Sequence, residues 1–179
     1  LPPVQHRLLV PITAVLLLLV VGFGATLIVQ YRSHLHKSST AMLSDVGTKL
    51  DATLREQSAM LAALEEVILL HDDARLRSAL AAGDTSRLLA DWGHVFEKLR
   101  QAHGVTHFYF HGPDRVNLLR VHKPERNGDL IDRFTVLQAE RSGQMASGIE
   151  LGPLGTFTLR VVRPIFDGEV LLGYLELGK

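Results

Sequence analysis

The strongest pattern along the chain is an apolar run over residues 8–29 that contains no charged side chain. A helix needs roughly 20 apolar residues to cross a hydrocarbon core about 30 Å thick. The run therefore predicts a transmembrane helix, which we place at 8–30. A cleaved secretory signal is the alternative, but its apolar part would be shorter and would end in small residues. This run instead continues through Val29 to Tyr31. A core helix of a soluble protein would rarely be uncharged on every face over such a length.

Residues 38–70 lack proline and have a helical apolar pattern, which predicts one long amphipathic helix. The apolar positions are Leu43, Val46, Leu50, Leu54, Leu61, Leu64 and Ile68. Their spacing suits packing against a partner helix, although Thr53 and Gln57 interrupt the stripe of a strict coiled coil. The stripe is consistent with self-association and with packing on the chain's own domain, and the two can hold along different parts of the helix.

Two shorter helices are predicted at 73–82 and 85–102. Gly83 and Gly104 would end them with left-handed caps, and Asp84 would cap the second helix at its N-terminus. From residue 105 the apolar period changes to two, which predicts strands at 105–111, 116–121, 145–151, 157–164 and 170–177. A further helix is predicted at 129–141, capped by Asp129 and ended at Gly143. This order predicts an α+β fold in which helices cover one side of a mostly antiparallel, five-stranded sheet.

Composition and charge limit the possible partners. The chain has 19 basic and 19 acidic side chains, and the basic residues are dispersed, so no electrostatic footprint for nucleic acid is present. Cysteine is absent, which is compatible with an exported domain and with a cytosolic one. Arg7 precedes the apolar run while Arg32 and Lys37 follow it, so basic residues do not decide its orientation. Beyond the run, the length suits one small globular unit.

Three stretches of the strand region resemble a known family. The sequence LRVHKPERNGD at 119–129, which follows HFYFH at 107–111, is similar to the pattern FLRxHxPExxGD of Cache-type, PAS-like sensory domains. The sequence RVVRPIFDG at 160–168 resembles the late hairpin of the same family. One departure is Leu118, which stands where the family usually has phenylalanine and which alters pocket shape more than chemistry. The resemblance covers roughly residues 38–179.

The resemblance implies the extracellular sensor region of a bacterial receptor: a histidine kinase of a two-component system, a chemoreceptor of chemotaxis or a cyclic-di-GMP enzyme. It implies an inner-membrane protein with a cytoplasmic tail at 1–7, the transmembrane helix at 8–30 and a periplasmic sensor. In the sensor, 31–102 would form the juxtamembrane and N-terminal helices and 103–179 the PAS-like Cache sheet domain. We expect a homodimer through the long helix. Any histidine kinase or diguanylate cyclase activity would lie beyond Lys179.

Polar side chains on one face of the predicted sheet are the candidate ligand-binding residues. Alternate residues of a strand share a face, so Arg120 and His122 are neighbours, whereas Leu119 and Val121 point to the apolar side. The candidates are His107, Tyr109, Arg120, His122 and Arg160. An arginine fork matches two anion oxygens, which predicts a small anionic ligand such as an organic acid. Alternatively, these side chains are solvated or paired with Glu125, Asp129 or Asp132.

The sequence contains no clear motif for a metal, a cofactor or catalysis. His107 and His111 are four positions apart, or roughly 13 Å along a strand, which is too far for one ion. His34 and His36 could share an ion before the long helix, but nothing else supports it. The chain contains no haem-attachment motif, nucleophile elbow or phosphate-binding glycine loop. We therefore expect no metal, no cofactor and no catalysis in this segment. The alternative to a ligand sensor is a structural or protein-interaction domain that mediates dimerisation.

Overall fold

The computed structural model describes residues 4–71, 73–152 and 155–179, with the side chains of 4–10 and 33–41 left aside. The predicted pair His34 and His36, and residues 1–3 of the predicted tail, lie outside this described part. The chain divides into two compact units, Leu1–Ala52 and Thr53–Lys179. Each unit is described separately below.

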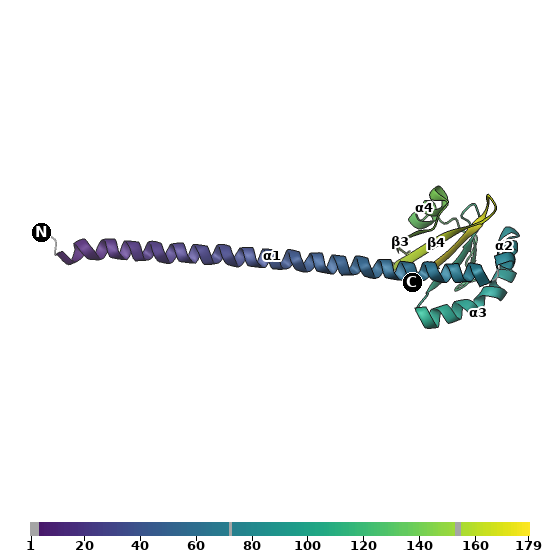
Figure 1. Ribbon diagram of the computed structural model, residues 1–179, viewed down its shortest axis with the longest axis horizontal. Helices are drawn as coiled ribbons and strands as arrows, with labels where there is room; N and C mark the ends of the chain where they lie inside the picture. Colours follow the sequence, from purple (N-terminus) through teal and green to yellow (C-terminus); the bar gives the residue numbers. More distant parts are fainter. Residues whose placement is uncertain (1–3, 72, 153–154) are drawn as a thin grey trace. The chain divides into compact units, whose positions relative to one another are not determined.

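The first unit is helical throughout its described residues. Helix α1 spans Val4–His71, so the two helices expected at 8–30 and 38–70 form one continuous element (Figure 1). The segment Pro11–Arg32 is long and apolar enough to cross a membrane. Within it, the hydroxyl of Thr26 donates a hydrogen bond of 2.7 Å to the carbonyl of Gly22, so this polar group is satisfied inside an apolar segment. Leu43, Val46 and Leu50 of the amphipathic stripe are exposed in this unit.

The second unit contains the end of α1, three shorter helices and a five-stranded sheet. Its helices are α2 (Asp73–Ala81), α3 (Thr85–His103) and α4 (Phe134–Ser142). Its strands are β1 (His107–His111), β2 (Asn117–Arg120), β3 (Ala146–Leu151), β4 (Phe157–Asp167) and β5 (Val170–Gly178). The strand order is β2-β1-β5-β4-β3, and every neighbouring pair is antiparallel. The predicted α+β fold with five antiparallel strands is confirmed.

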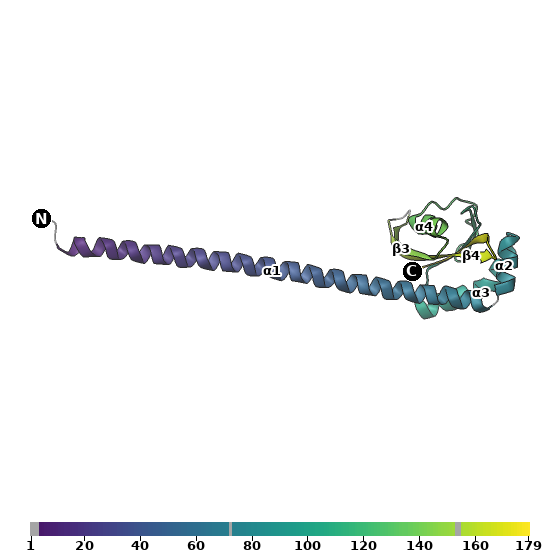
Figure 2. The ribbon, with the colours of Figure 1, turned by 45° about the horizontal axis from the view of Figure 1, so that its top comes forward.

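Two apolar cores lie on opposite faces of the sheet because successive strand residues point to opposite sides. Val161 joins the larger core, where Trp92 of α3 packs against Phe108 at a ring distance of 6.4 Å. Its neighbour Val162 joins the smaller core beneath α4. The expectation that helices cover one side only is therefore wrong: α4 covers part of the second face, and Figure 2 shows it opposite α3.

The predicted caps of α3 are confirmed. The side chain of Asp84 accepts a hydrogen bond from the Arg87 N–H, and Gly104 ends the helix with φ 69°. Gly143 likewise ends α4 with φ 64°. The predicted start of α4 is wrong, because the helix begins at Phe134 and Asp129 does not cap it. Residues 121–133 instead form an irregular connection beside the end of β2.

Candidate functional site

Tyr109 of β1 is the centre of a polar cluster on the face of the sheet that α4 partly covers. It lies opposite Arg120 of β2 on one side and Glu176 of β5 on the other. The guanidinium carbons of Arg120, Arg133 and Arg160 lie 5.5, 5.3 and 5.6 Å from the centre of its ring. These distances are typical of cation–π contacts. One buried aromatic ring therefore gathers three arginines from different parts of the chain.

A cavity of about 310 Å³ opens beside this ring. The structure brings all five predicted candidates to its wall: His107, Tyr109, Arg120, His122 and Arg160. Sequence reasoning did not propose six other lining residues, which are Lys123, Arg126, Arg133, Gly152, Thr156 and Thr158. Of these, Arg133 falls within the helix predicted at 129–141, and Lys123 follows the strand predicted at 116–121. Their loop positions carry no strand period that could have assigned them to this face.

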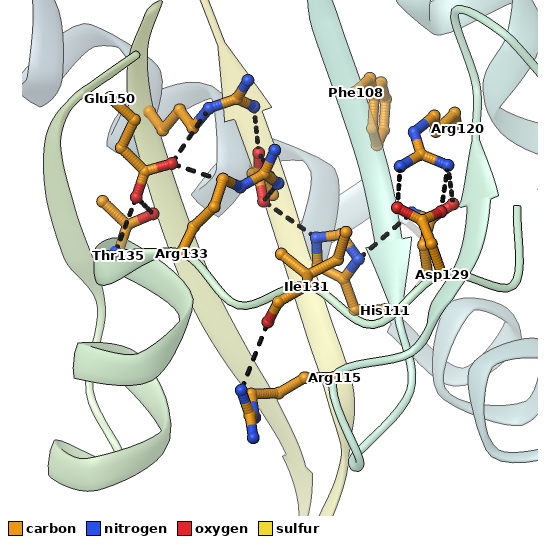
Figure 3. Close-up of polar contacts among 12 residues, drawn as sticks. Phe108, His111, Arg115, Arg120, Asp129, Ile131, Arg133, Thr135 and Glu150 are labelled. Carbon is orange, nitrogen blue, oxygen red and sulfur yellow. Dashed lines mark hydrogen bonds and ion pairs between the residues drawn. The ribbon is translucent and has the colours of Figure 1, made fainter. Parts of the chain in front are cut away.

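Arg120 is fully engaged by its own loop. Its two terminal nitrogens each donate a hydrogen bond of 2.7 Å to Asp129 (Figure 3). Nη1 also lies 3.1 Å from Asn117 Oδ1 and 2.6 Å from the Arg126 carbonyl. The hydrogen bonds from Arg120 hold the pKa of Asp129 below its usual range. The pairing with Asp129 that the sequence left open is therefore present. Arg120 fixes the loop 121–130 against β2 as well as lining the cavity.

Arg133, Glu150, Arg160 and Glu176 form a closed ring of alternating charges. Arg133 Nη2 donates to both carboxylate oxygens of Glu176, at 2.7 and 2.9 Å, and Arg160 Nη1 donates to Glu176 Oε1. Glu150 Oε2 lies 3.3 Å from the Nε atoms of both arginines. Because buried charges are stable only when paired, this ring accounts for two arginines at the cavity wall.

Glu176 is completely buried, yet it remains ionised. Burial alone would raise its pKa, but the hydrogen bond from His111 and the charge of Arg133 outweigh burial and lower the pKa to about 2. His111 Nε2 donates to Glu176 at 2.9 Å, and Asn117 donates to His111 Nδ1 at 3.2 Å. An imidazole protonated on Nε2 satisfies both contacts. Through Asn117, this buried network also reaches Arg120 at the other end of the cavity.

Glu150 has a second role at the first turn of α4. Its Oε1 atom accepts hydrogen bonds from the backbone N–H of Thr135, at 2.8 Å, and from the Thr135 hydroxyl, at 2.7 Å. A helix N-terminus leaves N–H groups without intrahelical partners and favours negative charge. The helix that Asp129 was expected to cap is thus capped by a carboxylate from β3, and this ties α4 to the charged ring.

The two cavity histidines are neutral at physiological pH. Burial, together with the charge of Arg160, lowers the pKa of His107 to about 4. Burial also lowers the pKa of His122, whose Nδ1 atom lies 3.2 Å from the Phe108 N–H. The rings of His107 and His122 meet edge to face at 4.9 Å. They therefore offer hydrogen-bonding groups to the cavity rather than permanent charge.

The lining is strongly cationic. Its charged members among the described residues are Arg120, Lys123, Arg126, Arg133 and Arg160, and no aspartate or glutamate lines the cavity there. Three carboxylates outside the lining, Asp129, Glu150 and Glu176, neutralise three of these arginines from behind. Lys123 and Arg126 lie on the exposed loop at the mouth. A fourth carboxylate, Glu125, lies 3.9 Å from Lys123 at the exposed surface, so four anions stand against five cations and one positive charge is left over. No group of residues suited to a metal ion occurs in the described part of the chain.

A five-stranded antiparallel sheet with a long N-terminal helix on one face and a ligand-sized cavity on the other defines a PAS-like sensor domain of the Cache type. Residues 37–179 match the family described as "Double sensory domain of two-component sensor kinase". The chain belongs to this family, and the resemblance predicted from its sequence is confirmed. Its role is therefore sensory.

Several solved structures of sensor domains are similar to this chain. A domain of a sensory box/GGDEF family protein from Vibrio parahaemolyticus is 21% identical, with a TM-score of 0.50, over 72% of this chain and 56% of that one. The sensor domain of the V. cholerae histidine kinase DctB is 17% identical, with a TM-score of 0.46, over 73% and 54%. The ligand-binding domain of the Campylobacter jejuni chemoreceptor Tlp3, in complex with L-valine, is 13% identical, with a TM-score of 0.38, over 72% and 60%.

The chain thus spans 54 to 60% of the length of these three structures. A comparison with curated protein sequences gave no match.

Proposed function

We propose that the second unit binds a small anionic metabolite in the cavity beside Tyr109. The observation that carries this proposal is the lining: five cationic side chains, two neutral histidines and no acidic side chain in its described part. Arginine and lysine side chains in such a concave site attract and orient carboxylate or phosphate oxygens. The volume of about 310 Å³ is at the lower end of small-molecule sites, which favours a compact ligand.

The same lining favours an organic acid over an amino acid. An α-ammonium group needs a carboxylate or several oxygen acceptors, whereas the carboxylates nearest the cavity are already held by arginines. The remaining positive charge would be balanced by an acid group of the ligand. Tyr109 provides an aromatic surface for the carbon skeleton between the acid groups.

The apolar segment Pro11–Arg32 would anchor the chain in the bacterial inner membrane. The sensor would then lie in the periplasm and the N-terminal tail in the cytoplasm. The exposed stripe of Leu43, Val46 and Leu50 would join two copies along α1. Ligand would shift the balance between two packings of the sensor on α1, by no more than its difference in affinity for the two states. The output domain, a histidine kinase, a diguanylate cyclase or a chemoreceptor signalling domain, would follow Lys179.

The test is a ligand screen on the full chain in detergent. Melting is followed by the fluorescence of Trp92, the single tryptophan, which is buried against Phe108. Ligand at about 100 times its dissociation constant should stabilise the fold by roughly 2.7 kcal/mol. The panel contains organic acids, the amino acids of matching carbon skeleton and inorganic phosphate.

The diagnostic variant is Arg126→Ala, because this lining side chain is exposed and its removal leaves the charged ring intact. The matched control is Arg87→Ala on α3, an exposed arginine remote from the cavity lining. We expect organic acids to raise the melting temperature of wild type and the control, and to act more weakly on Arg126→Ala. A folded protein that responds to no compound would contradict the proposal and favour a structural or protein-interaction domain.

A further inference from the structure

A second buried carboxylate lies away from the cavity, where α1 packs on the sheet. Glu65 is completely buried, between Leu61 and Ile68 on the same face of the helix. Both oxygens of its carboxylate lack a hydrogen-bond partner of ordinary geometry. The nearest cation is Arg163 of β4, whose Nε atom lies 3.5 Å from Oε2. A charged carboxylate in this position is poorly solvated and poorly bonded.

Arg163 cannot fully compensate Glu65 because it is shared. Its Nη1 atom lies 3.1 Å from Glu66, which is exposed, and its Nη2 atom lies 3.4 Å from the Ala62 carbonyl. Two carboxylates therefore compete for one guanidinium group. Glu65 is completely buried whereas Glu66 is exposed to water, so burial favours the neutral form of Glu65.

The other elements packed around Glu65 supply no additional cation. Glu176 of β5, on the opposite face of the sheet, adds negative charge. Arg77 of α2 is held at the surface by Asp73 at 2.5 Å. The buried side chains of α3 are apolar. Burial, opposed only in part by Arg163 and by the backbone of Leu177, accordingly raises the pKa of Glu65 well above its ordinary value of 4.5.

We propose that Glu65 is a proton-binding site that makes the packing of α1 on β4 and β5 depend on external pH. In the protonated state the neutral carboxyl is compatible with the apolar core, and α1 stays docked. Loss of the proton places an undercompensated charge in that core and loosens the last turns of α1. The proposal is independent of any ligand in the cavity.

The sign of the pH effect follows from proton binding. The folded state retains the Glu65 proton at pH values where the unfolded state has lost it. Stability contributed by this group is therefore complete below about pH 4.5 and is lost as pH rises through the folded-state pKa. Glu65→Gln imitates the neutral form at every pH and should lack this slope.

The experiment compares the full chain in detergent as wild type, Glu65→Gln and the control Glu66→Gln. Melting temperatures are measured from pH 4.5 to 8.5, and amide exchange is measured along α1. We expect the advantage of Glu65→Gln over wild type to grow as pH rises. After correction for the intrinsic exchange rate, protection near Leu61 and Ile68 should fall with pH in wild type but not in Glu65→Gln. Glu66→Gln should keep a pH dependence of the same sign, with a smaller slope because Arg163 is then no longer shared with a second carboxylate.

A second readout keeps the test decisive if Glu65→Gln folds poorly. The infrared absorption of a protonated carboxylic acid should be present in wild type at mildly acidic pH and should disappear as pH rises, with the same midpoint as the change in exchange. Parallel pH profiles for wild type and Glu65→Gln, or absence of the protonated band at mildly acidic pH, would overturn the proposal.

Discussion

Asp129 binds both terminal nitrogens of Arg120, each at 2.7 Å, although the carboxylate is about half exposed and the arginine side chain is only 9% exposed. The pair joins the end of β2 to a loop residue that follows Gly128. Arg120 additionally donates to the Asn117 side chain and the Arg126 carbonyl, so its removal leaves three acceptors without their donor. The arginine of the family-like motif therefore supports the shape of the cavity before any ligand arrives.

Replacing Arg120 with alanine should consequently lower stability as well as any ligand response. We expect a loss of about 1.5–3 kcal/mol, typical of hydrogen bonds to charged groups, in urea unfolding at neutral pH. Asp129→Asn keeps the cavity cation and should cost less. The lowered pKa of Asp129 means that its contribution is present above its unfolded pKa of 3.8 and disappears as pH falls through the folded value. Equal stability of Arg120→Ala and wild type would show that the pair is not structural.

The contact between Glu150 and Thr135 gives a second prediction. Thr135→Val keeps the shape of the side chain but removes the hydroxyl that donates to Glu150 Oε1 at 2.7 Å. Since Thr135 is completely buried, we expect a cost of about 1 kcal/mol and faster amide exchange in α4. Glu150→Gln should be worse, because it also removes the charge between Arg133 and Arg160. Unchanged exchange in α4 in both variants would exclude Glu150 as its cap.

Strand alternation was sufficient to place five cavity residues on one face, because parity along a strand is a local property. Arg120 and Arg160 come from β2 and β4, and both lie on the face of the sheet that carries the Tyr109 ring. Glu150, which caps α4 from β3, could not be predicted, because that contact depends on how distant elements pack. The same holds for Arg133, whose loop obeys no period. In the sequence Asp129 precedes an apolar run, as a helix cap would. In the structure its carboxylate pairs with Arg120 instead.

The lowered pKa values of the two cavity histidines, His107 and His122, lead to a prediction of how ligand affinity depends on pH. In the free protein the pKa of His107 is about 4 and that of His122 is lowered, both by burial first and by neighbouring arginine charge second. A bound anion would favour the imidazolium form and raise both pKa values. Under the proposed function, affinity should therefore increase as pH falls from 7 toward 4, with uptake of protons on binding.

Calorimetric titrations of an organic acid in two buffers of different ionisation enthalpy would measure that uptake. His107→Gln should reduce it, whereas His103→Gln on the exposed end of α3 should not. In the absence of ligand the same histidines oppose folding in acid, because the unfolded chain binds protons more readily below its histidine pKa of 6.5. An affinity that is constant between pH 7 and 5 would count against contact between the anion and these rings.

The absence of a side chain at Gly178 of β5 leaves room at the floor of the cavity. Gly178 lies between His107 of β1 and Arg160 of β4 in the sheet, so a side chain there would point to the cavity face. An added Cβ would lie 3.1 Å from His107 Cβ and 3.1 Å from Thr158 Cγ2, which is tighter than ordinary contact. Gly178→Ala should therefore displace two lining side chains and weaken ligand binding by more than its effect on melting would suggest.

Gly93→Ala is the control, because its Cβ would lie 3.8 Å from Leu89 and alanine favours the helix by about 1 kcal/mol. If Gly178→Ala bound ligand as tightly as wild type, the ligand would not reach this floor.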